Sequence, residues 1–141
     1  HGRMHKEVGD LMAESDAACY VIDCLPNMNA TTVAERCVPL VKQLRKARPN
    51  TPIVLVEDRR FANSWLLPAK AKFHDDNQAA LQKAYKELKA AGVKQLHYLR
   101  GDLLLGGDTE GTTDGSHPND LGFFRQADAF EPVLLQALGL K

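Results

Sequence analysis

The chain alternates between stretches in which apolar residues recur every three or four positions and short stretches that are apolar throughout. The first pattern places apolar side chains on one face of a helix, and the second is typical of strands buried on both faces of a parallel sheet. The spacings predict helices over residues 3–15, 31–48, 75–91 and 121–138, and strands over residues 19–25, 53–56 and 93–99.

Helices and strands take turns along the chain, which indicates parallel strands joined by right-handed crossovers. We therefore predict an α/β fold of the flavodoxin-like kind, with a parallel sheet between two layers of helices (α/β/α). Residues 1–141 form one domain in this interpretation, because a chain of this length supports a single hydrophobic core. Three strands make a narrow sheet, and we expect that the first strands of the fold are missing from this chain.

The segment before the third helix is expected to be irregular over residues 61–73. His74 is followed by two aspartates, and acidic residues favour the first turn of a helix, where they complement the helix dipole. We therefore expect the third helix to begin beside His74. The same run of one histidine and two aspartates could instead hold a metal ion, which is the alternative interpretation.

Composition narrows the classes of function. Lysine and arginine together number 18, as do aspartate and glutamate, so the formal net charge is zero and gives no reason to expect a nucleic-acid partner. No apolar run approaches the roughly 20 residues that a membrane-spanning helix needs. No signal peptide is visible, but the chain begins at His1 without a methionine, so these patterns do not indicate a compartment.

The cysteines do not suggest a metal or disulfide site. Cys19, Cys24 and Cys37 lack the paired spacing of a zinc site or a disulfide framework. We interpret them as small apolar residues of the interior, and we expect neither a metal nor a cofactor in this protein.

Polar residues follow each predicted strand, at the edge of a parallel sheet where ligands usually bind. Asn27 comes after the first strand, Asp58 with two arginines after the second, and Asp114 with His117 after the third. The charged group after the second strand is expected to be solvated or ion-paired, and shaping a substrate pocket is the alternative. Asn27 could likewise be a plain turn residue.

The pair formed by Asp114 and His117 is the strongest candidate for chemistry. A carboxylate three residues before a histidine can accept a hydrogen bond from one ring nitrogen in a turn, and the other nitrogen is then free to act as a base. Gly115 gives the backbone the freedom that such a turn needs. The alternatives are structural: Asp114 could be an ordinary turn residue, and His117 could cap the last helix. No serine of the chain is expected to be the nucleophile. Ser15 ends the first helix, Ser64 lies in the irregular segment with Trp65, and Ser116 stands between Asp114 and His117, where its side chain should diverge from the free ring nitrogen.

A family resemblance sharpens this interpretation. Residues 114–123, Asp-Gly-Ser-His-Pro-Asn-Asp-Leu-Gly-Phe, resemble the last conserved block of the SGNH hydrolases, the GDSL-like esterases and lipases. In that family the block supplies the acid and the base of a Ser-His-Asp triad. The resemblance therefore implies that Asp114 and His117 are catalytic.

Two further stretches are similar to family blocks. Residues 20–28 resemble the third block, whose asparagine donates its side-chain amide to the oxyanion, which implies that role for Asn27. Leu25 and Met28 replace the usual glycine and second polar residue, a departure that resembles carbohydrate-acting esterases of the family. The first four residues resemble the end of the second block, so Gly2 is a candidate oxyanion donor, although we expect the donor glycine itself just before His1.

The resemblance implies a serine ester hydrolase that removes acyl groups from small or carbohydrate esters, such as acetylated polysaccharide. Trp65 and Met28 are candidate substrate contacts, the nucleophilic serine is expected upstream, and the chain alone is expected to be inactive. Family members of this kind suggest a secreted or periplasmic protein. Two alternatives stay open: a non-catalytic flavodoxin-like binding module, and a metal-dependent hydrolase that uses His117, Asp114 and His74.

Overall fold

The computed structural model describes residues 2–102 and 104–140. Within these ranges, four helices and three strands alternate along the chain, and two short 3-10 turns, η1 and η2, follow the first two strands. Their order and bounds are α1 (Lys6–Glu14), β1 (Tyr20–Ile22), η1 (Leu25–Asn27), α2 (Ala30–Ala47), β2 (Ile53–Val56), η2 (Ser64–Leu66), α3 (Pro68–Ala90), β3 (Leu96–Leu99) and α4 (Asp120–Leu138).

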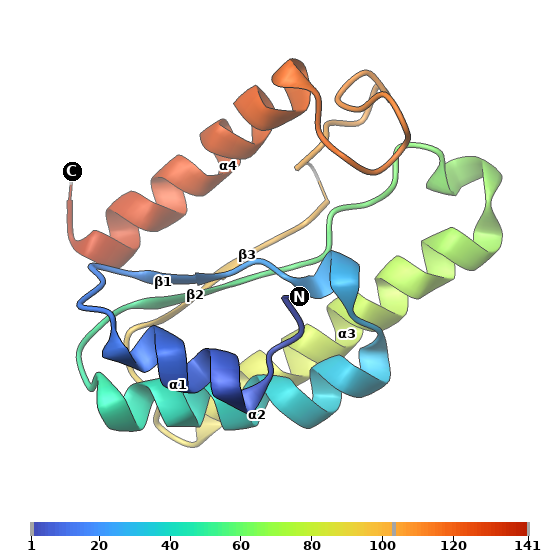
Figure 1. Ribbon diagram of the computed structural model, residues 1–141. Coiled ribbons are helices and arrows are strands. Elements are labelled where there is room, and N and C mark those ends of the chain that lie inside the picture. The colour runs from blue at the N-terminus through green and yellow to red at the C-terminus, as the bar shows by residue number, and fades with distance from the viewer. Residues whose placement is uncertain (1, 103, 141) are drawn as a thin grey trace.

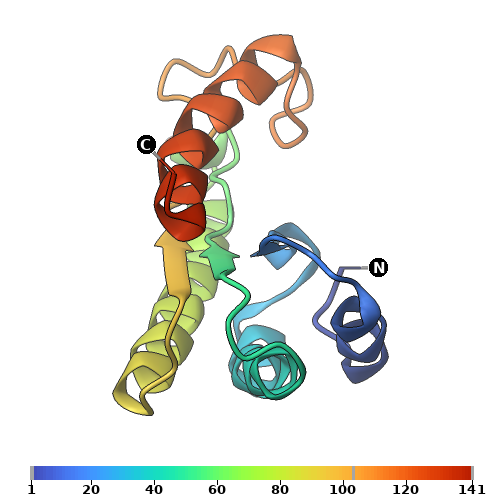
Figure 2. The same cartoon turned by 90° about the vertical axis from the view of Figure 1, so that its left-hand side faces the viewer.

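The three strands form one parallel sheet in the order β1-β2-β3, with Tyr20 beside Ile53 and Ile53 beside Leu96. α4 lies on one face of the sheet, and α1, α2 and α3 lie on the other (Figures 1 and 2). This arrangement confirms the predicted three-layer α/β/α fold with a parallel sheet. None of the helices in the described ranges is long and apolar enough to cross a membrane.

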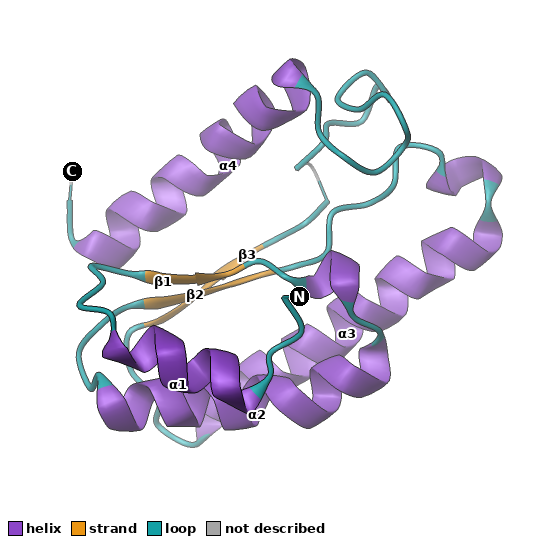
Figure 3. Ribbon diagram, in the orientation of Figure 1, coloured by secondary structure: helices purple, strands orange, loops and turns teal. Residues whose placement is uncertain are grey.

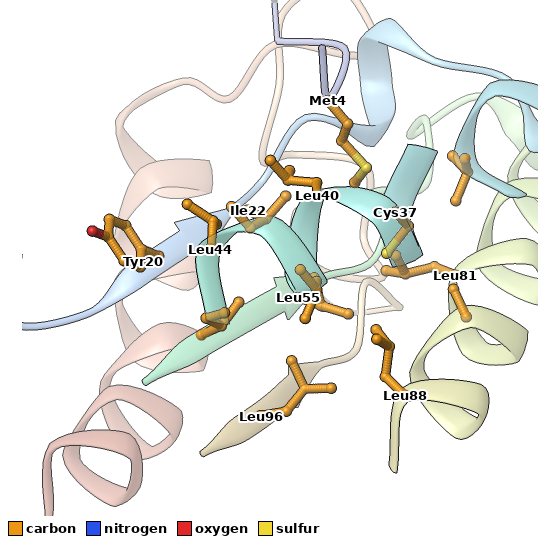
Figure 4. Packing of buried hydrophobic residues seen from close by; sticks show 14 of the residues in the cluster. Met4, Tyr20, Ile22, Cys37, Leu40, Leu44, Leu55, Leu81, Leu88 and Leu96 are labelled. Carbon is orange, nitrogen blue, oxygen red and sulfur yellow. The ribbon is translucent and has the colours of Figure 1, made fainter. Parts of the chain in front are cut away.

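The core consists of two clusters separated by the central strand. All four residues of β2 are buried, with Ile53 and Leu55 in the cluster below the sheet and Val54 and Val56 in the cluster under α4. Figure 4 shows the first cluster, in which side chains from α2 and α3 pack against the strands. Burial on both faces explains why this strand is apolar at every position.

β1 is shorter than expected. It ends at Ile22, and the apolar run then continues as η1, in which Leu25 is fully buried. Pro26 stands in the first turn of η1, where its fixed backbone angle suits a helical turn and its missing N–H removes no bond. Asn27 therefore sits at the end of a turn that the buried Leu25 anchors, and not directly after a strand.

α3 begins at Pro68, so the expected start near residue 75 is wrong. Proline fits the first turn of a helix, and this signal at position 68 prevails over the two aspartates that follow His74. Asp75 and Asp76 lie inside the helix instead, where they form ion pairs with Arg60 and Lys72. His74 consequently faces the interior and is fully buried.

α2 begins with a reciprocal cap. Thr32 N–H donates to Asn29 Oδ1 at 2.9 Å, and Asn29 N–H donates to Thr32 Oγ1 at 3.1 Å. Such a capping box satisfies two backbone groups that would otherwise lack partners. The helix continues through Pro39 to Ala47. The turn that carries Asn27 is thus followed at once by a firmly capped helix.

Candidate active site

Three connecting segments leave the sheet at the carboxyl ends of its strands, and Figure 3 shows their loops in teal and the turns η1 and η2 in purple. They are residues 23–29 after β1, residues 57–67 after β2 and the described residues 100–102 and 104–119 after β3. Because the strands are parallel, the three segments lie along the same edge of the sheet, which is where the candidate residues were expected.

Asp114 and His117 are directly hydrogen-bonded. His117 Nδ1 lies 2.6 Å from Asp114 Oδ2, while Asp114 Oδ1 accepts the backbone N–H groups of Ser116 at 2.8 Å and His117 at 2.7 Å. Gly115 between them has φ +86°, in the left-handed region that glycine adopts without strain. The structure therefore brings the two side chains together in the turn that their spacing predicts.

The contact between Asp114 and His117 suits a histidine that acts as a base. Hydrogen bonds from the His117 ring, and then from the backbone N–H groups of His117 and Ser116, lower the pKa of Asp114 well below its usual range. The carboxylate therefore stays ionised and accepts a hydrogen bond from the N–H group at Nδ1. The His117 side chain is 78% exposed, and its Nε2 has no hydrogen-bond partner in the described part of the chain. Nε2 is the ring nitrogen that can accept a proton.

The turn is held at both ends. Thr112 and Pro118 form an antiparallel bridge across it. Asn119 N–H donates to Gly111 O at 3.1 Å, and Asn119 Oδ1 accepts Gly122 N–H at 3.0 Å to cap α4. The base therefore sits between a closed loop and the start of a long helix, so its backbone position is defined from both sides.

Arg59 fixes the same turn from the end of β2. Its Nε donates to Ser116 O at 2.5 Å, and its Nη2 donates to Ser116 Oγ at 3.0 Å. The expected solvated or ion-paired role for Arg59 is thus replaced by a contact with Ser116. The Ser116 hydroxyl is directed to the guanidinium, which agrees with the expectation that this serine is not the nucleophile.

Asn27 and Gly2 lie close together. A Cβ placed on Gly2 would be 3.9 Å from Asn27 Nδ2 and 2.9 Å from the Cβ of Cys24. Glycine is therefore needed at this position, because a larger side chain would collide with Cys24. The two candidate oxyanion donors share one place in the fold, and their roles in catalysis stay predictions.

Met28 and Trp65, the candidate substrate contacts, differ in their surroundings. Met28 is 5% exposed and belongs to the core below the sheet, with its Sδ 3.7 Å from Cys24 Sγ, so its side chain packs the interior. Trp65 is 72% exposed on η2. Together with Asp114 it lines a cavity of about 430 Å³. Met28 also lines a cavity beside Asn27. Both residues therefore stay candidate substrate contacts, and Met28 packs the core as well.

A buried hydrogen-bond network links the segments after β1 and β2. His74 Nδ1 lies 3.1 Å from Asp58 Oδ2, and both side chains are fully buried. Asn77 Nδ2 donates to the same carboxylate at 3.1 Å and to Met28 O, next to Asn27, at 3.2 Å. Phe61 N–H donates to His74 Nε2 at 3.3 Å. No local pattern in the sequence indicates this network, because its members become neighbours only when α3 packs against the sheet edge.

The network also decides the alternative in which His74, Asp114 and His117 hold a metal. Both ring nitrogens of His74 are occupied, one by Asp58 and the other by the Phe61 N–H. His74 is buried, whereas His117 stands on an exposed turn. No group of three or more metal-binding side chains with suitable placement occurs within residues 2–102 and 104–140. The three residues therefore do not form a common ligand set.

Comparison with known proteins agrees with the fold described above. A family model described as the GDSL-like Lipase/Acylhydrolase family matches residues 1–135. A solved structure from Bacteroides ovatus ATCC 8483, described as a GDSL-like lipase, has a TM-score of 0.95 and 33% identity over 100% of this chain. The salicylyl-acyltransferase SsfX3 of a tetracycline biosynthetic pathway has a TM-score of 0.75 and 22% identity over 98% of the chain, which indicates a shared fold.

The chain spans 42% of the length of each of these two solved structures. No curated protein matches the chain.

Proposed function

The chain belongs to the GDSL-like lipase and acylhydrolase family, and on that basis we propose that it is part of a serine ester hydrolase. His117 is the general base and acid, Asp114 orients it, and Asn27 stabilises the oxyanion. The nucleophilic serine comes from a part of the protein outside residues 1–141. The proposal is supported above all by the 2.6 Å contact between His117 Nδ1 and Asp114 Oδ2, which leaves Nε2 to accept a proton.

The proposed reaction has two acyl-transfer steps. The serine oxygen attacks the ester carbonyl carbon while its proton moves to His117 Nε2, and Asp114 stabilises the resulting imidazolium. The carbonyl oxygen, on which negative charge develops, accepts a hydrogen bond from Asn27 Nδ2. Collapse of this intermediate expels the alcohol, which takes the proton from His117. A water molecule then repeats the sequence and releases the acid and the free serine.

The proposed substrates are small or carbohydrate esters, such as acetylated polysaccharide. The exposed Trp65 supports this class, because an indole ring on the surface offers a flat apolar face against which a sugar ring can pack. The cavity that Trp65 shares with Asp114 also contains Thr112 and Thr113, whose hydroxyl groups suit the hydrogen-bonding pattern of a sugar. Trp65 would then hold the alcohol part of the ester close to the base.

Covalent labelling of the intact protein tests the serine mechanism. A fluorophosphonate probe reacts only with a serine that a neighbouring base activates. We expect labelling of the unaltered protein and of His97→Ala, a control on β3, and loss of labelling in His117→Ala. Mass spectrometry should place the label on a serine outside residues 1–141. Labelling that persists unchanged in His117→Ala would show that His117 is not the base.

A further inference from the structure

We propose that the cavity beside Asn27 is a subsite for a carboxylate group carried by the substrate. This inference rests on the proposed function, because it takes Asn27 as the donor that holds the ester carbonyl. The cavity has a volume of about 450 Å³ and lies between the start of the chain, η1 and α2. Its polar and charged lining comes from Arg3, His5, Asn27, Asn29, Thr32 and Arg36.

The cavity carries positive charge without a compensating carboxylate. No aspartate or glutamate contributes to its lining. Within the described ranges, neither Arg3 nor Arg36 has a carboxylate oxygen within 4.0 Å, whereas four other arginines of the chain do. Since the whole chain has a formal net charge of zero, this pair of arginines is a local concentration of positive charge. Such a concentration attracts an anionic group.

Arg36 is held in place by contacts that use only part of its guanidinium. Its Nη1 donates to Arg3 O at 3.0 Å and lies 3.4 Å from the ring nitrogens of His5. No hydrogen bond from Nε or Nη2 to the described residues is found. Two parallel N–H groups on Nε and Nη2 can bind both oxygens of a carboxylate. The backbone contact therefore orients the side chain while leaving its binding edge available.

The position of Asn27 connects this subsite to the chemistry. Asn27 lines the same cavity, so a substrate whose carbonyl oxygen meets its amide would extend a neighbouring group toward the arginines. Pro26, Met28 and Phe73 supply an apolar wall that suits a sugar ring or a short alkyl chain between the ester and the carboxylate. The carboxylate can belong either to the acyl group, as in a succinyl ester, or to the alcohol, as in an acetylated uronic acid.

Matched substrate pairs, tested on the intact protein, distinguish these two sources. The first pair is 4-nitrophenyl acetate and mono-4-nitrophenyl succinate, and the second is the acetyl esters of methyl glucoside and of methyl glucuronoside, whose carboxylate is free. We expect kcat/KM to favour the charged member of one pair by about tenfold or more, as befits a charge-assisted hydrogen bond. The pair that shows the preference identifies whether the charge lies on the acyl group or on the alcohol.

Variants locate the origin of this preference. Arg36→Gln should abolish it, and Arg3→Gln should reduce it while keeping the backbone carbonyl that holds Arg36. Lys86→Gln, on the exposed surface of α3, removes the same charge from the protein and should leave the preference intact. A preference that survives in both arginine variants, or the absence of any preference, would overturn the subsite.

Binding without turnover separates the subsite from the proposed function. In His117→Ala, calorimetry should show that succinate or methyl glucuronoside binds at least about tenfold more tightly than its uncharged counterpart, succinamide or methyl glucoside. Binding that depends on Arg36 would support the subsite even if no ester is hydrolysed, in which case the proposed function is wrong. Hydrolysis of neutral esters without selective anion binding would refute the subsite and leave the proposed function standing.

Discussion

Arg59 and Ser116, which are 57 positions apart in the sequence, are joined by two hydrogen bonds from one guanidinium. The contact ties the end of the central strand to the turn that carries His117. A base that must meet its proton within hydrogen-bond distance depends on such a fixed backbone. We therefore expect the catalytic rate to depend on this contact as well as on the residues that perform the chemistry.

Replacing Arg59 by methionine should slow the proposed ester hydrolysis without unfolding the protein. The turn would lose both bonds to Ser116, and a displacement of His117 by a fraction of an ångström to one ångström should lower kcat roughly 10- to 100-fold with a small change in KM. Arg60→Met is the matched control, because Arg60 is also half-buried but pairs with Asp75 and Asp102. Equal losses of kcat in the two variants would contradict a specific role for Arg59.

Asp114→Asn should remove most of the activity while preserving the fold. An amide cannot stabilise the imidazolium as a carboxylate does, and we expect kcat to fall by roughly 10³-fold or more. Steady-state kinetics on a neutral ester measures this effect. Asp108→Asn is the control, because Asp108 lies in the same long segment and is bonded to Arg125 instead of a histidine. If Asp114→Asn retained near-normal kcat, the turn would have only a structural role.

Replacing Asn27 should affect the catalytic rate, whereas replacing Asn29 should affect stability. Asn27→Ala should lower kcat about 10²- to 10³-fold through loss of an oxyanion donor, with little effect on stability. Asn29→Ala should instead cost about 1 kcal/mol of stability through loss of the α2 cap, with little effect on kcat for a neutral ester. Chemical denaturation and kinetics on both variants test this separation. The same profile in both would show that Asn27 acts through the fold.

His74→Ala should destabilise the protein by about 3 kcal/mol, because it leaves a fully buried Asp58 carboxylate without one of its donors. The free energy of unfolding in urea is the appropriate measurement. His97→Ala provides the comparison, since His97 is half-buried and its Nε2 has no partner in the described structure. A cost no larger than that of His97→Ala would mean that the pair contributes little.

The buried thiols should make stability decline at alkaline pH. Burial raises the pKa of Cys24 to about 11 and that of Cys37 to about 12, from an unperturbed value of 9.0. Above about pH 9 the unfolded chain loses thiol protons that the folded chain keeps, so the stabilisation is complete below pH 9 and is lost as pH rises toward 11–12. Urea unfolding between about pH 7 and pH 10.5 should show a shallower decline for Cys37→Ala, and identical slopes would contradict this account.

Apolar periodicity predicted much of the fold because it reflects burial directly. β2 occupies the expected residues 53–56, since a strand covered on both faces must be apolar throughout. The start of α3 was predicted wrongly, because aspartates after His74 are typical of a first turn and also of ion pairs on an exposed helix face. Only packing distinguishes these two uses of the same residues.

Some residues of the candidate site could also be predicted from local sequence, and others could not. The contact between Asp114 and His117 follows from three positions of sequence and a glycine, so a local pattern could predict it. The roles of Arg59 and Asn77 depend on partners 57 and 49 positions away, which no local pattern indicates. Met28 combines two surroundings, because it belongs to the core and also lines the cavity beside Asn27, so its predicted substrate contact stays a prediction.

The chain contains two histidine–aspartate pairs that look alike when only Nδ1 is considered. They differ in what meets the opposite ring nitrogen: the Phe61 amide for His74, and open solvent for His117. An imidazole whose Nε2 already accepts a hydrogen bond from a main-chain N–H cannot take a proton there without breaking that bond. The hydrogen bond from the Phe61 N–H therefore prevents His74 from acting as a base. The same two types of side chain thus stabilise the interior at one place in the fold and leave a ring nitrogen open to solvent at another.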